Sequence, residues 1–219
     1  DVCSSDLMKQ AACLSINPLT AFGMFQMAGK KGAKAFILNA AAGQVPGFMR
    51  VLAKEKGVNV INIVRKDQQV ENLKEEGEKW ALNSNSEGFG EKLKEACDKL
   101  SPALAFDAVA GDQTGHLLNI MPGGAEVVVY GGLSGHPSGK LDPLGLIFKN
   151  KIVTGFNLGD WIAGLDVDEF QRVTDHVQDL FVEGKFHTEI QAEFKLDDAV
   201  KGIRHYLKSM SAGKVLLRP

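Results

Sequence analysis

Short apolar runs alternate with amphipathic stretches along residues 34–157, and this alternation leaves few folds open to the chain. The runs predicted to be strands are 35–39, 58–64, 80–82, 103–110, 125–130 and 151–156. Between them, residues 45–56, 69–76, 90–100 and 115–121 place apolar side chains at helical spacing. Strands that alternate with helices of about ten residues form βαβ units around a parallel sheet. Because the strands are apolar throughout, helices must cover both faces, and we predict an α/β, Rossmann-type doubly wound parallel sheet.

The pattern changes after residue 157. Residues 168–181 predict a long helix, 186–194 a half-exposed strand, 196–210 another helix and 215–217 a last short strand. In the helix at 196–210, the apolar residues Ala199, Val200, Ile203 and Leu207 are expected to face inward.

Composition excludes several classes of protein. A net charge of −2 argues against a nucleic-acid binder, and no apolar run is long enough to predict a membrane span. The cysteines Cys3, Cys13 and Cys97 form no CxxC pair, which suits a reducing compartment, either the cytoplasm or the mitochondrial matrix. The histidines are scattered, so no metal site is expected.

The first seven residues do not resemble a protein start. Residues 1–7 lack an initiator Met and the apolar core of a signal peptide. They match the translation of a common sequencing adapter, so we expect a non-native tail in front of native sequence that begins near Met8. A natural polar tail is the alternative.

A turn rich in glycine and alanine follows the first predicted strand. In a doubly wound fold this turn binds phosphate, because glycines allow close approach and the next helix offers free N–H groups. When residues 39–47 are laid on the G-x-G-x-x-G pattern, only the middle glycine, Gly43, remains. Pro46 has no N–H and is expected to begin the helix, while Gly47 is expected to restore close packing between helix and strand.

Two cations end the second predicted strand. Arg65 and Lys66 stand where an NAD-binding protein carries the acid that binds the ribose hydroxyls. A cationic pair at this place favours the 2′-phosphate of NADPH, although a solvated strand end is the alternative. Asp67 is expected to cap the following helix.

Several stretches together resemble the medium-chain dehydrogenase/reductase superfamily, most closely its zinc-independent branch of quinone-oxidoreductase-like and mitochondrial 2-enoyl thioester reductase-like proteins. They keep their order along the chain: AACLSINPLTA at 11–21, VINIVR at 60–65, AFDAVAG at 105–111, VYGGLSG at 129–135, LIFKNK at 146–151, GFNL at 155–158 with Trp161, and GKVLL at 213–217. One departure is Ala110, where the family usually has glycine.

The resemblance implies a domain layout. Residues 8–33 are expected to link from a missing N-terminal domain, 34–184 to form the Rossmann dinucleotide-binding domain, and 185–219 to return to a GroES-like catalytic domain. In this branch the proton-donating tyrosine lies in the missing part, so no catalytic residue is assigned. Tyr130 and Tyr206 do not fit that role.

The resemblance also implies a set of site residues. NADPH would lie across Ala42, Gly43, Gln44 and Val45 with its pyrophosphate, and on Arg65 and Lys66 with its 2′-phosphate. It would pass Val109, Ala110, Gly111, Tyr130, Gly131, Gly132 and Leu133, and reach the backbone of Phe156, Asn157 and Leu158 with its nicotinamide. Thr20 and Trp161 would line the substrate cleft, although Phe156 and Trp161 could equally be core aromatics.

The expected function is an NADPH-dependent oxidoreductase that reduces a small-molecule quinone or an activated C=C bond, with this chain inactive alone. A catalytically inactive nucleotide-binding or dimerising module is the alternative. A methyltransferase shares the sheet but expects an acid where Arg65 stands. We also expect a homodimer through residues 151–156, with Leu146, Ile147, Phe148, Ile152 and Val153 as contacts.

Overall fold

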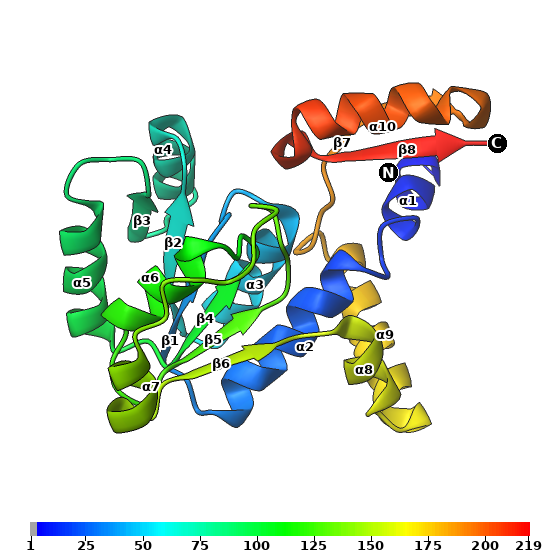
Figure 1. Cartoon of the computed structure of the whole chain (residues 1–219). Helices are drawn as coiled ribbons and strands as arrows, with labels where there is room; N and C mark the ends of the chain where they lie inside the picture. Colours follow the sequence, from blue (N-terminus) through cyan, green and yellow to red (C-terminus); the bar gives the residue numbers. More distant parts are fainter. Residues whose placement is uncertain (1–3) are drawn as a thin grey trace.

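A six-stranded parallel sheet forms the centre of the molecule (Figure 1), as the alternation of apolar runs predicts. The computed structural model describes residues 4–219, with side chains from Met8 onward. Residues 1–3 of the expected adapter-like tail, and the side chains of residues 4–7, therefore lie outside the described part. The strands follow the order β3-β2-β1-β4-β5-β6, which is the strand order of a Rossmann fold. They are β1 (Ala35–Leu38), β2 (Asn59–Val64), β3 (Trp80–Asn83), β4 (Leu104–Asp107), β5 (Glu126–Val129) and β6 (Ile152–Gly155).

Helices cover both faces of the sheet (Figure 1). The helices of this region are α2 (Asn17–Lys30), α3 (Gln44–Glu55), α4 (Asp67–Glu75), α5 (Phe89–Leu100), α6 (Asp112–Ile120), α7 (Pro143–Lys149), α8 (Leu158–Ala163) and α9 (Val167–Val182). The sequence pattern predicts neither α7 nor α8 as a helix. Each has seven residues or fewer, too few to show a helical period.

Two hydrophobic cores lie on opposite faces of the sheet. In β1, Phe36 and Leu38 pack into the core shared with α2 and α3. Ile37, between them, packs into the other core with Leu93 of α5 and Leu118 of α6. Because β1 is buried on both sides, its sequence is apolar at every position, as a central parallel strand requires.

The C-terminal part forms a smaller unit beside the sheet (Figure 1). A second, two-stranded parallel sheet pairs β7 (Ile190–Lys195) with β8 (Lys214–Arg218), and α10 (Ala199–Lys208) packs on it. Helix α1 (Ser4–Ala11) joins this unit, because the Gln10 side chain bonds the backbone N–H and carbonyl of Thr188 at 2.8 and 2.9 Å. Short 3₁₀ turns lie at Leu196–Asp198 and Met210–Ala212.

Helix α10 is turned differently from the sequence prediction. The buried residue of α10 is Gly202, and a Cβ atom built there would lie 3.2 Å from Leu217 and 3.3 Å from Phe194. Val200, Ile203 and Leu207 are 57–63% exposed, so the prediction that they face inward is wrong. A small residue faces the two-stranded sheet because helix and sheet approach closely, and Val200 and Ile203 lie on the exposed side of α10.

Candidate functional site

Helix α3 begins two residues earlier than Pro46, where the sequence predicts its start. Gly43 is the N-cap and Gln44 the first helical residue, so Pro46 lies in the third position. The first four N–H groups of a helix have no partner within it, and a proline there breaks no helical hydrogen bond. Gly47 donates to the Gly43 carbonyl at 3.1 Å and is the first residue of α3 to close a helical bond.

Gly47 does not supply the close helix–strand packing expected of it. A Cβ atom built there would meet only the Arg50 guanidinium, at 3.9 Å. The third glycine of the phosphate-binding pattern therefore has no structural replacement at this position.

The loop before α3 nevertheless keeps free donors. Gly43 donates to the Ala40 carbonyl at 2.9 Å, which closes the turn. Within residues 4–219, no backbone carbonyl accepts the N–H groups of Ala42, Gln44 or Val45. Free N–H groups and the positive end of the helix dipole are suited to an anion.

At the end of β2, Arg65 and Lys66 are exposed. In the described part of the chain neither pairs with an acid. Asp67 does not cap α4: it is the first helical residue, and its carboxylate accepts from Asn83 at 2.7 Å. The two cations are therefore available to a ligand.

A cavity of about 450 Å³ joins these features at the carboxyl ends of the strands. Its lining brings together most of the predicted cofactor residues: Ala42, Gly43, Gln44, Val45, Arg65, Lys66, Tyr130, Gly131 and Leu133. Four cations line it, Arg65, Lys66, Lys208 and Lys214, and no Asp or Glu does. In a chain of net charge −2, such a lining is suited to a ligand with several negative charges.

The C-terminal wall of this cavity is absent from the sequence prediction. Tyr206, Lys208 and Lys214 reach it from α10 and β8, more than 140 residues after Arg65. The Lys214 ammonium lies 5.7 Å from the centre of the Tyr206 ring, which holds the charge at the cavity wall. One signal could have revealed them: after Ala199 the sequence has five Lys or Arg and no Asp or Glu.

Buried polar side chains join the strand ends beneath the cavity. Asp107 accepts the N–H groups of Val109 and Ala110 at 2.8 and 2.9 Å, and the Thr114 hydroxyl at 2.7 Å. Ala110 has a φ of +59°, in the left-handed region, which explains why the family usually has glycine there. Burial, and to a lesser extent the charge of Asp107, raises the pKa of the Tyr130 hydroxyl, so the phenol stays protonated.

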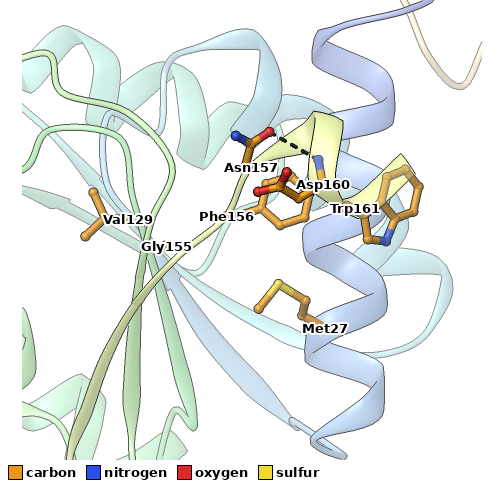
Figure 2. A pocket seen from close by; sticks show the side chains of 7 residues that line it. All are labelled: Met27, Val129, Gly155, Phe156, Asn157, Asp160 and Trp161. Carbon is orange, nitrogen blue, oxygen red and sulfur yellow. Dashed lines mark hydrogen bonds between the residues drawn. The ribbon is translucent and has the colours of Figure 1, made fainter. Parts of the chain in front are cut away.

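The predicted nicotinamide and substrate residues lie apart from this cavity. Phe156, Asn157 and Trp161 line a second hollow of about 530 Å³ with Met27 and Asp160, at the carboxyl end of β6 and beside α2 (Figure 2). The rings of Phe156 and Trp161 lie 6.3 Å apart, and both press on Gly23 of α2, where any Cβ would clash. Asn157 caps α8 by accepting from Gly159 and Asp160.

The remaining predicted residues line neither hollow. They are Thr20, Val109, Ala110, Gly111, Gly132 and Leu158, and Leu158 packs instead against the small core around Val173. Their roles toward a cofactor or substrate stay predictions.

The part of the chain that the structure describes does not fit a metal ion. No three His, Cys, Asp or Glu side chains gather there as ligands. Nor does any helix in residues 4–219 have the length and apolar character to cross a membrane.

Comparison of the sequence with known proteins gives one matching family profile and several related reductases. The profile of the zinc-binding dehydrogenase family matches residues 48–179. The mitochondrial enoyl-[acyl-carrier-protein] reductase of Arabidopsis thaliana is 29% identical over 190 residues, which cover 84% of this chain and 50% of the relative. That of Dictyostelium discoideum is 30% identical over 178 residues, 79% of this chain and 51% of the relative.

Solved structures with the same fold are also named as reductases. A Mesorhizobium loti protein assigned as an NADPH:quinone reductase superposes with a TM-score of 0.89 at 32% identity, over 96% of this chain and 60% of that chain. An enoyl thioester reductase of Candida tropicalis shares the fold at a TM-score of 0.80 and 22% identity, over 96% of this chain and 61% of that one. The chain spans about half the length of the curated relatives it matches. The Rossmann sheet and the family match agree: the chain belongs to the zinc-binding dehydrogenase family of the medium-chain dehydrogenase/reductase superfamily.

Proposed function

We propose that this chain is the cofactor-binding part of an NADPH-dependent reductase that acts on a quinone or on the activated C=C bond of an enoyl thioester. The observation that carries the proposal is the cavity at the strand ends, lined by four cations and no acid. The names of the relatives support it, because they are enoyl reductases and an NADPH:quinone reductase.

The residues of the cavity fit this cofactor. The free N–H groups at the start of α3 and the Lys214 ammonium would hold the pyrophosphate. Arg65 and Lys66 would hold the 2′-phosphate, since neither has an acidic partner in the described part. Bound NADPH would supply the hydride, while the protein would bind and orient the cofactor.

A cofactor titration tests the proposal. NADPH should bind the 219-residue chain, followed by fluorescence, at least tenfold more tightly than NADH. Equal binding of NADH would contradict the assignment of Arg65 and Lys66, and no binding of either would refute the nucleotide site.

We expect no catalytic turnover from this chain alone. The oxidation of NADPH with a quinone or an enoyl thioester as acceptor would measure this turnover. Of the predicted nicotinamide and substrate residues, only Phe156, Asn157 and Trp161 line the second hollow, and no proton donor is assigned there. Steady turnover would show that the chain holds its own proton donor.

We also propose that the chain forms a homodimer through β6. This strand is the sheet edge, and Ile147 and Phe148 of the preceding helix α7 are 64% and 75% exposed. The curated relatives are named mitochondrial, and a reducing compartment, matrix or cytoplasm, stays the expectation for this chain.

A further inference from the structure

The phosphate loop of this chain has fewer backbone donors than a glycine-rich loop. Pro46 has no N–H, and the N–H groups of Ala41, Gly43 and Gly47 donate to the carbonyls of Ile63, Ala40 and Gly43 at 3.0, 2.9 and 3.1 Å. Of residues 41–47, only Ala42, Gln44 and Val45 keep a backbone N–H for a ligand. A pyrophosphate bound here would therefore have one backbone donor fewer from the loop than a glycine at residue 46 would give it.

One side chain in the loop carries such a donor. Gln44 is the first residue of α3, is half-buried, and lines the cavity. Its amide Nε2 lies 3.4 Å from the Glu189 carbonyl, and its Oε1 accepts from the Asn17 amide at 3.3 Å. Both bonds are long, near the outer limit of a hydrogen bond, so they stabilise this orientation only weakly.

The Gln44 amide can leave Glu189 at little cost. The same Glu189 carbonyl already accepts the Lys214 backbone N–H at 2.7 Å. If Gln44 turns away, the Glu189 carbonyl keeps its stronger bond, and the half-buried Asn17 amide, which lines the same cavity, loses only a long bond of 3.3 Å. The amide donors would then point into a cavity that favours anions, at the positive end of α3.

We propose that the Gln44 side chain replaces the donor that Pro46 removes. When the pyrophosphate binds, the Gln44 Nε2 amide turns from the Glu189 carbonyl and donates to a phosphate oxygen. This role deepens the proposed NADPH site and rests on it. It makes Gln44 a cofactor-binding side chain, in addition to the backbone role that the loop alone implies.

The substitution Gln44→Glu separates this role from a structural one. Glu keeps the size of the side chain, and its negative charge at a helix N-terminus is favourable for the helix. The melting temperature should therefore stay equal or rise, while the affinities for NADPH and NADH should both fall more than tenfold, because the carboxylate repels the pyrophosphate. Binding of adenosine 2′-monophosphate, which has no pyrophosphate, should not change. Gln171→Glu, the same change on the exposed face of α9, is the matched control and should bind like the wild type.

A double-mutant cycle tests the link to Pro46. Gln44→Ala should weaken both dinucleotides at least tenfold, the loss of one hydrogen bond to a charged phosphate oxygen. Pro46→Gly restores a backbone N–H, and in the Gln44→Ala background it should recover most of that loss, whereas in the wild type it should change little. Wild-type affinity in both Gln44 variants, or losses that do not depend on residue 46, would overturn the inference while leaving the NADPH site intact. Failure of the wild-type chain to bind either dinucleotide would overturn both.

Discussion

The Asn39 and Asp107 side chains are hydrogen bonded to each other across the ends of the two central strands. Asn39 follows β1 and Asp107 ends β4, and neither side chain is exposed to solvent. The Asn39 amide donates to the Asp107 carboxylate at 2.5 Å, while its own oxygen accepts the Ala108 N–H at 2.7 Å. These strands flank the point at which the strand order reverses, where such folds bind their ligands. The pair therefore fixes the backbone at the floor of the cavity.

Replacing Asp107 by Asn should destabilise the protein strongly. Three donors reach the buried Asp107 Oδ1 and the Thr114 hydroxyl donates to Oδ2, so an amide removes the charge that strengthens all four bonds and sets an NH2 donor against the donating Thr114 hydroxyl. We expect a loss of about 2–4 kcal/mol in the free energy of unfolding, read as a lower urea midpoint. Asp98→Asn, which removes an exposed pair with Lys94, should cost less than about 0.5 kcal/mol. Equal effects of the two substitutions would show that the buried network contributes little.

The sheet could be predicted from sequence because its strands are buried on both faces and its helices carry clear periods. Local chemistry was harder to predict. The apolar spacing in α10 does not reveal which face of the helix is buried. The close approach of Gly202 to Phe194 in the structure shows that the Gly202 face packs on the two-stranded sheet. The part of the cavity wall that comes from one loop, around Gly43, could be predicted from sequence. Lys208 and Lys214 come from far along the chain, and a local motif does not reveal them.

Removing the charges of Arg65 and Lys66 should abolish the preference for NADPH. Each charge-assisted hydrogen bond to the 2′-phosphate is worth about 1.5–3 kcal/mol, so the double Ala variant should bind NADPH at least tenfold more weakly. Its affinity for NADH should stay near the wild-type value, because NADH lacks that phosphate. Lys74→Ala, on the exposed face of α4, is the control and should change neither affinity. Parallel loss for both cofactors would place these cations at the pyrophosphate instead.

The two sides of α10 should respond oppositely to substitution. Ile203 is 57% exposed, so Ile203→Ser should change the free energy of unfolding by less than about 0.5 kcal/mol. Gly202→Val places a branched side chain where the Cβ atom would already lie 3.2 and 3.3 Å from the nearest atoms of Leu217 and Phe194, and should cost about 1–3 kcal/mol. Thermal unfolding of both variants measures the difference. A larger loss for Ile203→Ser would mean that the apolar side of α10 is covered in solution.

The stability of the protein should fall between pH 9 and 11 through Cys97. Burial, aided by the charge of Asp98, raises the pKa of the Cys97 thiol to about 11 from its ordinary 9.0. The stabilising contribution is therefore full below pH 9, where the thiol is protonated in both states, and is lost as the pH rises toward 11, because the unfolded thiol ionises first. Over this range the wild type should lose about 2–3 kcal/mol more than Cys97→Ala, measured by urea unfolding at each pH. Parallel pH profiles for the two proteins would contradict the assignment.

A charge on the edge strand should separate the proposed homodimer into monomers. Ile152 lies on β6 and is 43% exposed, and Phe148 of the preceding helix α7 is 75% exposed, so the edge strand has unpaired backbone groups and exposed apolar side chains. Pairing of two edges across a two-fold axis would bury both. We expect a dimer at micromolar concentration by analytical ultracentrifugation, and a monomer for Ile152→Lys, since each copy would bring a charge into an apolar interface. Ile203→Lys, the same change on the exposed side of α10, is the matched control and should stay dimeric. A monomeric wild type would refute dimerisation, and a dimer that survives Ile152→Lys but not Ile203→Lys would place the interface on α10.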